Sequence, residues 1–277
     1  MAKFDLHLHS DNSDGSATVK ELVDTVVKSG IKIFALTDHD TVNGVKYAEI
    51  PDGIRFIKGV ELTCKIDNIN CHILGYNINL DSKELTELIE LGKKLRRQKL
   101  ETRIKYLKEV WNIELTKEEL DWLYSRKSVV KTHIANILVK RGLSDNNVDA
   151  MKKYLDGCKT GNTKFDGREA VNVIKAAGGI PVWAHALGGE GEEHLSEEEF
   201  LSQLKTMLGC GIQGLECYYS RYTMKECEFL VQCAKENNLL ISGGSDWHGI
   251  NKTVPIGRLN TDDTEISSDK INIIDYL

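Results

Sequence analysis

The sequence predicts an α/β fold, a barrel or a wound sheet interrupted by a helical insertion. Three observations support it. Residues 1–81 alternate short apolar runs with helical patterns, residues 82–156 carry charged helical patterns without strand-like runs, and the strand–helix alternation returns in residues 157–277. We therefore expect two barrel segments, 1–81 and 157–277, and an insertion domain at 82–156.

The first segment supplies four predicted strands and one helix. Short apolar runs predict strands at 4–9, 31–37, 54–62 and 70–78. The pattern at 18–28 predicts a helix that ends at Gly30. The pair Asp67-Asn68 has the turn chemistry expected between the last two strands.

The insertion is predicted to be helical because Leu85, Leu88, Leu95, Ile104 and Leu107 recur at helical spacing. A basic run at 93–99 is surrounded by glutamates, so we expect a solvent-exposed helix face rather than a polyanion-binding one. A further helix is expected at 132–141, before Gly142.

The second segment repeats the strand–helix pattern. Helices are expected at 167–177 and 223–236, and a third should begin at the capping box formed by Ser196 and Glu199 and end near Gly209. Strands are expected at 180–184, 214–218 and 239–242, and the first of them is followed directly by His185.

Composition excludes several classes of protein. The net charge of −6 argues against attraction of the whole surface to nucleic acid, so stable binding of duplex DNA is not expected. The seven cysteines include no Cys-x-x-Cys pair and are interpreted as reduced thiols. With no signal-peptide core and no apolar run of about 20 residues, we expect a cytoplasmic protein without membrane contact. We also expect a monomer.

Chemistry-bearing side chains gather at the ends of the predicted strands, where barrel enzymes place reactive groups. His7 and His9 are two residues apart on one strand, so both side chains leave the same face and can bind one ion. Asp14 follows in a loop of small polar residues. Such a loop can fold a carboxylate back over the strand end.

Three further strand ends carry the same residue types. Thr37-Asp38-His39-Asp40 follows the second strand, Glu61 ends the third, and Asp246-Trp247-His248 follows the last. A lone strand-end histidine is usually structural, but this joint occurrence is difficult to explain by packing alone. Imidazole and carboxylate ligands together suit zinc, manganese or iron.

These residues resemble, in order and context, the polymerase and histidinol phosphatase (PHP) family of the amidohydrolase superfamily. The matching segments span nearly the whole chain: His7-Leu8-His9-Ser10, Thr37-Asp38-His39-Asp40, Glu61, Ala184-His185 and Ser245-Asp246-Trp247-His248-Gly249. The resemblance implies a distorted seven-stranded (β/α) barrel with a helical insertion, holding two or three divalent metal ions, manganese, iron or zinc.

The resemblance also implies a ligand set. His7, His9, Glu61 and Asp246 would hold one ion, and Glu61 would bridge to a second ion held by His72 and His185. Asp14, His39 and His248 would hold a third. Asp14, His39, Glu61 and His248 are the implied catalytic residues.

The implied reaction is hydrolysis of a phosphate ester by metal-activated water. The expected substrate is small and phosphorylated, a nucleoside 3′,5′-bisphosphate that loses its 3′-phosphate or short RNA trimmed from the 5′ end. The substrate-binding candidates are Arg126, Lys131, His133, Ser220 and Arg221.

Three alternatives stay open at this point. A related subgroup hydrolyses a cyclic phosphate on phosphoribose, and the sequence alone does not separate it from the first. The barrel could also be a non-catalytic metal-binding module, as in PHP domains attached to DNA polymerases, or a deaminase of the amidohydrolase type. Histidinol phosphate phosphatase fits less well because its insertion differs.

Overall fold

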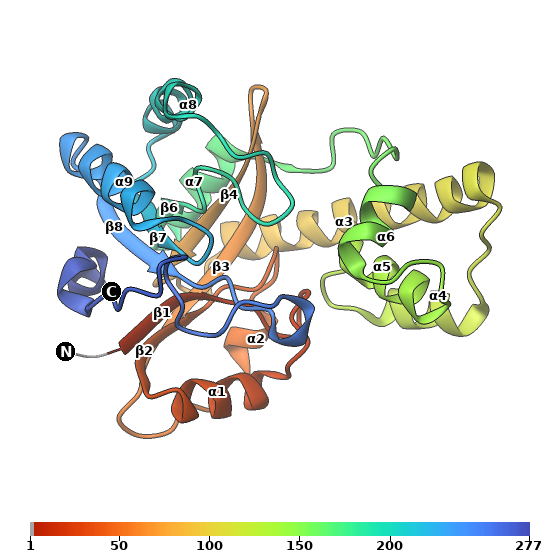
Figure 1. Ribbon diagram of the computed structural model, residues 1–277, viewed down its shortest axis with the longest axis horizontal. Helices are drawn as coiled ribbons and strands as arrows, with labels where there is room; N and C mark the ends of the chain where they lie inside the picture. Colours follow the sequence, from red (N-terminus) through yellow and green to blue (C-terminus); the bar gives the residue numbers. More distant parts are fainter. Residues whose placement is uncertain (1–2) are drawn as a thin grey trace.

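The computed structural model describes residues 3–277; Met1 and Ala2, which begin the first predicted barrel segment, lie outside the described residues. One sheet curls into a nearly closed barrel in the strand order β1-β2-β3-β4-β6-β7-β8 (Figure 1). The strands are β1 (Lys3–Leu8), β2 (Ile31–Leu36), β3 (Arg55–Ile66), β4 (Ile69–Tyr76), β6 (Ile180–Trp183), β7 (Gly214–Tyr219) and β8 (Leu240–Gly244). The short strand β5 (Phe165–Asp166) pairs beside β3. The predicted α/β barrel is confirmed, and its distortion has a cause, since β4 runs antiparallel to both neighbours.

The barrel closes between its first and last strands. Leu8 forms a parallel bridge with Trp247, and the His9 amide donates to the Trp247 carbonyl at 3.0 Å. β8 approaches β1 so closely that a Cβ on Gly244 would lie 2.3 Å from the Cβ of His7, so only glycine fits there. The buried Asp5 carboxylate accepts hydrogen bonds from both the amide and the hydroxyl of Ser245.

Helices cover the outside of the barrel (Figure 1). They are α1 (Val19–Lys28), α2 (Asn43–Lys46), α7 (Gly167–Ala176), α8 (Glu197–Cys210) and α9 (Met224–Glu236). Short 3₁₀ helices follow: η1 (Gly249–Asn251), η2 (Ser268–Lys270) and η3 (Asn272–Tyr276). Capping boxes at Thr18, Ser196 and Thr223 begin α1, α8 and α9.

Four helices occupy the predicted insertion and form a lobe beside the barrel (Figure 1). They are α3 (Lys83–Trp111), α4 (Lys117–Ser125), α5 (Lys131–Lys140) and α6 (Asn147–Tyr154). The long helix α3 takes part in two apolar cores, because Leu85 and Leu88 pack into the barrel core whereas Leu100 and Leu107 pack into the core of the lobe. No helix in residues 3–277 combines the length and apolar character needed to cross a bilayer.

The structure corrects two details of the sequence prediction, the position of Glu61 in its strand and the burial of Arg96. β3 continues to Ile66 in a hairpin with β4, so Glu61 lies within the strand rather than at its end, paired with Leu74. In the basic run at 93–99, Lys93, Lys94, Arg97 and Gln98 are exposed as expected, but Arg96 is only 7% exposed and forms an ion pair with Asp40 at 2.5 Å. In both cases a tertiary partner, unrecognised in the sequence, determined the outcome.

Candidate metal centre and active site

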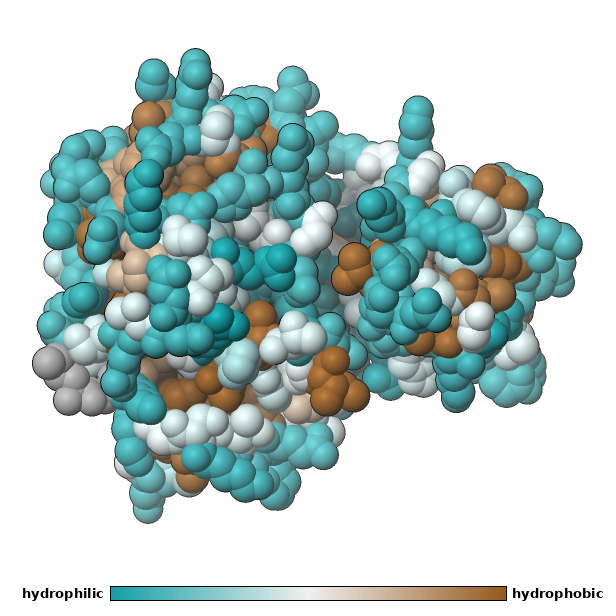
Figure 2. Space-filling view, viewed as in Figure 1, coloured by the Kyte–Doolittle hydropathy of each residue, from teal (hydrophilic) through white to brown (hydrophobic). Residues whose placement is uncertain are grey.

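Six histidines and three carboxylates converge at one end of the barrel. They are the nine predicted ligands, His7, His9, Asp14, His39, Glu61, His72, His185, Asp246 and His248, and all are within contact distance of another member. Above them lies a cleft of about 690 Å³ between the barrel and the helical lobe. Figure 2 shows the surface hollowed between these two parts. The structure thus brings together side chains that are up to 241 positions apart, from His7 to His248.

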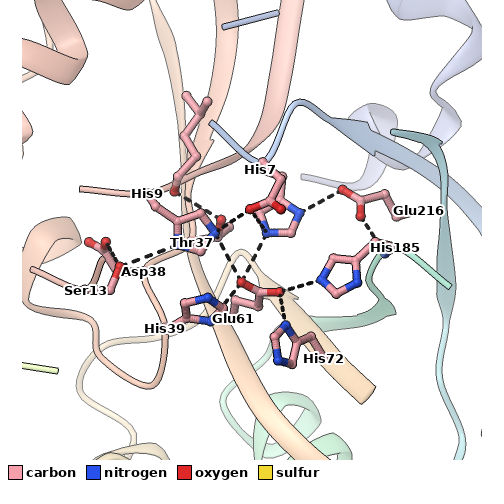
Figure 3. Close-up of polar contacts among 12 residues, drawn as sticks. His7, His9, Ser13, Thr37, Asp38, His39, Glu61, His72, His185 and Glu216 are labelled. Carbon is pink, nitrogen blue, oxygen red and sulfur yellow. Dashed lines mark hydrogen bonds and ion pairs between the residues drawn. The ribbon is translucent and has the colours of Figure 1, made fainter. Parts of the chain in front are cut away.

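Glu61 lies at the centre of the cluster (Figure 3). Its Oε2 atom faces three imidazole nitrogens, those of His7 and His9 at 3.2 Å each and that of His39 at 3.0 Å. Its Oε1 atom faces two others, His72 at 2.8 Å and His185 at 3.1 Å. One carboxylate therefore presents its two oxygens to two separate groups of donors.

The other two carboxylates extend the cluster towards β8. Asp246 Oδ1 lies 3.2 Å from His9 Nε2 and 3.7 Å from His7 Nε2. Asp14 Oδ1 lies 3.0 Å from His248 Nε2, and Asp14 Oδ2 lies 3.8 Å from His39. His9 and His39 lie between Glu61 and Asp14, since each approaches Glu61 with one ring nitrogen and Asp14 with the other.

The cluster fits metal ions better than it fits hydrogen bonds. Within residues 3–277 six of its buried atoms have no hydrogen-bond partner: His7 Nε2, His9 Nε2, Asp14 Oδ1, His39 Nδ1, Glu61 Oε2 and His248 Nε2. Tetrahedral ligands about 2.1 Å from one ion lie roughly 3.4 Å from each other. The separations of 3.2 to 3.7 Å among His7, Glu61 and Asp246 agree with that value.

The electrostatics also favour cation binding. Burial would raise the pKa of these carboxyl groups, but the imidazole of His39 holds the pKa of Glu61 well below its usual range, and His248 does the same for Asp14. The pKa of Asp246 is likewise lowered well below its usual range against the effect of burial, in the first place by the charge of Lys252. Three ionised carboxylates in one buried site attract cations.

The loop that carries Asp14 is fixed by Asp38. The buried Asp38 carboxylate accepts hydrogen bonds from the Ser10 amide at 2.8 Å, the Ser10 hydroxyl at 2.7 Å and the Ser13 hydroxyl at 2.6 Å. Gly15 lets the loop fold tightly, since a Cβ there would lie 2.3 Å from the His9 carbonyl oxygen. Asp38 thus holds the loop that returns Asp14 to the cluster.

Of the predicted substrate-binding residues, Lys131 lines the cleft, where it forms an ion pair with Asp156. His133 is not among the residues that line the cleft within the described part of the chain. It is buried, accepts a hydrogen bond from the Val130 amide and packs edge-on against Trp122. Burial lowers the pKa of His133 to about 4.

The other three candidates also lie away from the cleft lining, as far as residues 3–277 are concerned. Arg126 places its guanidinium over the Trp122 ring, 5.2 Å from its centroid. Ser220 is buried, and Arg221 lies 3.4 Å from Glu190. The structure thus gathers the candidate ligands but only one of the five substrate-binding candidates.

The basic side of the cleft is formed by Arg96 and Lys99, from the run that we expected to face solvent, and by Arg103, which we did not single out in the sequence. Arg96, Lys99 and Arg103 follow one face of α3, at positions i, i+3 and i+7, and all three line the cleft. Arg96 is balanced by Asp40, whereas neither Lys99 nor Arg103 has an acidic partner among residues 3–277. Burial lowers the pKa of Lys99 to about 7, and the charge of Arg96 adds to this effect. The spacing of these three basic residues on one helical face was the sequence signal that could have identified this side of the cleft.

Lys252 is another cleft residue that sequence reasoning missed. Its ammonium group lies 2.6 Å from Asp246 Oδ2, to which the Tyr219 hydroxyl also donates at 2.9 Å. Both contacts use the oxygen that faces away from the cluster, so Oδ1 stays directed at His9. Glu216 was missed as well, although it is the only charged residue in the apolar strand β7. It contacts His7 at 2.9 Å.

Comparisons with known proteins agree with the geometry. The PHP domain family matches residues 5–164. A 5′-3′ exoribonuclease from Haemophilus influenzae is 32% identical over 252 residues, 89% of this chain and 90% of that protein. A 3′,5′-nucleoside bisphosphate phosphatase from Chromobacterium violaceum is 27% identical, covering 90% of this chain and 88% of that protein.

One further relative and one solved structure also indicate a phosphoesterase. A phosphoribosyl 1,2-cyclic phosphate 1,2-diphosphodiesterase from Eggerthella lenta is 25% identical, over 91% of this chain and 96% of that protein. A crystal structure from Bifidobacterium adolescentis, assigned as a metal-dependent phosphoesterase, has a TM-score of 0.80 and 26% identity, covering 95% of this chain and 94% of its own. The predicted family and enzyme class are confirmed: the chain belongs to the PHP domain family, and these relatives are named as hydrolases of phosphate esters.

Proposed function

We propose that this protein is a metal-dependent phosphoesterase that removes the 3′-phosphate from nucleoside 3′,5′-bisphosphates or trims short RNA from its 5′ end. One observation carries the proposal: the Glu61-centred cluster opens into a cleft that is also lined by three basic side chains of α3, Arg96, Lys99 and Arg103. A substrate with one phosphate at the cluster and another against α3 matches this distribution of charge.

The proposed ligands are the nine clustered residues. His7, His9, Glu61 and Asp246 would hold one ion, Glu61 with His72 and His185 a second, and Asp14, His39 and His248 a third. Manganese, iron and zinc suit these nitrogen and oxygen donors. When bound, such ions lower the pKa of water and neutralise phosphate oxygens. Glu61, Asp14, His39 and His248 line the cleft, so in our proposal they face the reacting phosphate.

The residues of the chain would bind and orient the substrate. Lys131, at the start of α5, is the residue of the helical lobe that we propose contacts a substrate phosphate. On binding, its ammonium group would exchange the ion pair with Asp156 for one with that phosphate. Val148 and Met151 of α6 add apolar surface to the same cleft. A flat, uncharged part of the substrate, such as a nucleobase, fits an apolar surface of this kind.

A second candidate is hydrolysis of a cyclic phosphate on phosphoribose, favoured by the Eggerthella relative at 25% identity. A non-catalytic metal-binding module is less well supported, because all nine donors are retained and seven of them line an open cleft: Asp14, His39, Glu61, His72, His185, Asp246 and His248. A monomeric state, a cytoplasmic location and the lack of duplex DNA binding stay predictions.

The deciding experiment is a substrate comparison on purified protein whose metal content has been measured. Adenosine 3′,5′-bisphosphate, a 5′-phosphorylated RNA trimer, phosphoribose 1,2-cyclic phosphate and histidinol phosphate would be compared by kcat/KM. We expect the first two to be the best substrates. Preference for the cyclic phosphate would select the second candidate, and no turnover of any ester by metal-loaded protein would refute an enzymatic role.

A further inference from the structure

Glu216 is a buried carboxylate that connects two parts of the cluster. It lies in β7, is 0% exposed, and is surrounded along its strand by Leu215, Cys217, Tyr218 and Tyr219. A carboxylate without access to water is costly unless its oxygens accept good hydrogen bonds. Such a residue in the middle of an apolar strand therefore needs a specific reason.

Both oxygens of Glu216 are used, and each contacts a different proposed ligand (Figure 3). Oε1 lies 2.9 Å from His7 Nδ1. Oε2 accepts a hydrogen bond from the backbone amide of His185 at 2.7 Å. The side chain thus joins β1 to the segment that follows β6.

The contact to His7 determines which ring nitrogen faces the cluster. A carboxylate only accepts, so Nδ1 must carry a proton that it donates to Glu216. In the neutral ring Nε2 is then unprotonated, and its lone pair is directed to the side where Glu61 Oε2 lies at 3.2 Å. The same tautomer is the one in which Nε2 can bind a cation.

The contact to His185 fixes its backbone. His185 has a φ of +29°, outside the regions that residues with a side chain favour. Such a conformation persists only where surrounding contacts hold it. The Glu216 bond to its amide is such a contact, and it leaves the imidazole with Nε2 3.1 Å from Glu61 Oε1.

We propose that Glu216 is a positioning residue for the metal centre, which sets the tautomer of His7 and the backbone of His185 on the two sides of Glu61. The proposal rests on the metal-dependent function proposed above. Glu216 would then contribute to metal affinity on both sides of Glu61 by orienting His7 and His185, without being a metal ligand itself. Carboxylates that orient ligating histidines typically affect metal affinity or activity about 10- to 100-fold.

The test is the Glu216→Gln variant. An amide offers one acceptor and one NH₂ donor, so it cannot accept from both His7 Nδ1 and the His185 amide. We expect Mn²⁺ affinity, measured by titration calorimetry on metal-free protein, to fall about 10- to 100-fold. The matched control is Tyr76→Phe, which removes buried hydrogen bonds to the Leu6 carbonyl and to Ser242 inside the same barrel. It should lower thermal stability and leave Mn²⁺ affinity unchanged.

A second measurement does not depend on the folding of the Glu216→Gln variant. ¹⁵N spectra of histidine-labelled, Zn²⁺-loaded wild-type protein report the tautomer of His7, assigned by the loss of its signal in His7→Gln. We expect the proton on Nδ1. A proton on Nε2, or Glu216→Gln protein with wild-type Mn²⁺ affinity, would overturn the proposal. Weakened Mn²⁺ binding in a protein that hydrolyses no ester would support it while refuting the proposed enzymatic function.

Discussion

Arg96 and Arg103 offer a sharp test of how the cleft binds anions. They lie seven residues apart on the cleft-facing side of α3, roughly 10 Å along the helix axis. Both have a buried Nε atom without a hydrogen-bond partner in the described part of the chain. They differ in counter-charge, because Arg96 pairs with Asp40 at 2.5 Å and Arg103 has no acidic partner among residues 3–277.

The Arg103→Met substitution should therefore weaken substrate binding without weakening the fold. A hydrogen bond that involves a charged group contributes about 1.5–3 kcal/mol, which corresponds to about a 10- to 150-fold change in kcat/KM. We expect that loss for adenosine 3′,5′-bisphosphate. The loss should be under about 3-fold for p-nitrophenyl phosphate, whose single phosphate is needed at the cluster. The free energy of unfolding in urea should stay the same or rise.

Arg96→Met is the contrasting variant. It would leave the buried Asp40 carboxylate without its cation, and breaking a buried ion pair costs about 3–5 kcal/mol of unfolding free energy. The double variant with Asp40→Asn should recover much of that stability. The reasoning is refuted if Arg103→Met destabilises the protein as strongly as Arg96→Met, or if it lowers kcat/KM equally for both substrates.

Three further outcomes are expected. Asp246→Ala should abolish hydrolysis while the circular dichroism spectrum stays unchanged. Chelation of the metal in wild-type protein should also abolish hydrolysis until Mn²⁺ is restored. Turnover by Asp246→Ala above about 1% of wild type would contradict the ligand role of Asp246. Lys131→Ala should raise KM without changing kcat in steady-state assays, and unchanged kinetics would remove this residue from the site. Lys99 has a pKa of about 7 in the fold, below its unfolded value, so the unfolded chain binds more protons between about pH 7 and 10.5 and stability should rise with pH there. The rise in the free energy of unfolding between pH 6.5 and pH 9.5, measured in urea, should therefore be smaller in Lys99→Met than in wild type. Lys94→Met, on the exposed side of α3, should show the wild-type rise.

The sequence predicted the local elements and most of the proposed ligands. Capping boxes and apolar periodicity depend on residues a few positions apart, so α1, α8 and α9 could be predicted to within a few residues. The spacing of His7 and His9 is also local, because alternation along a strand places both side chains on one face whatever the rest of the fold does. The positions of Asp14, His39, Glu61, Asp246 and His248 at or just after predicted strand ends indicated a shared site, and the family resemblance supplied their division among three ions.

Only the tertiary structure decided how these residues are supported. Glu61 could be recognised as a strand carboxylate, but its two oxygens acquired separate partners only when β3 was placed between β2 and β4. The roles of Glu216 and Arg96 depend on contacts with residues 209 positions away, in His7, and 56 positions away, in Asp40. Local pattern cannot encode such pairs, because barrel closure and the packing of α3 determine which face of a strand or helix is buried.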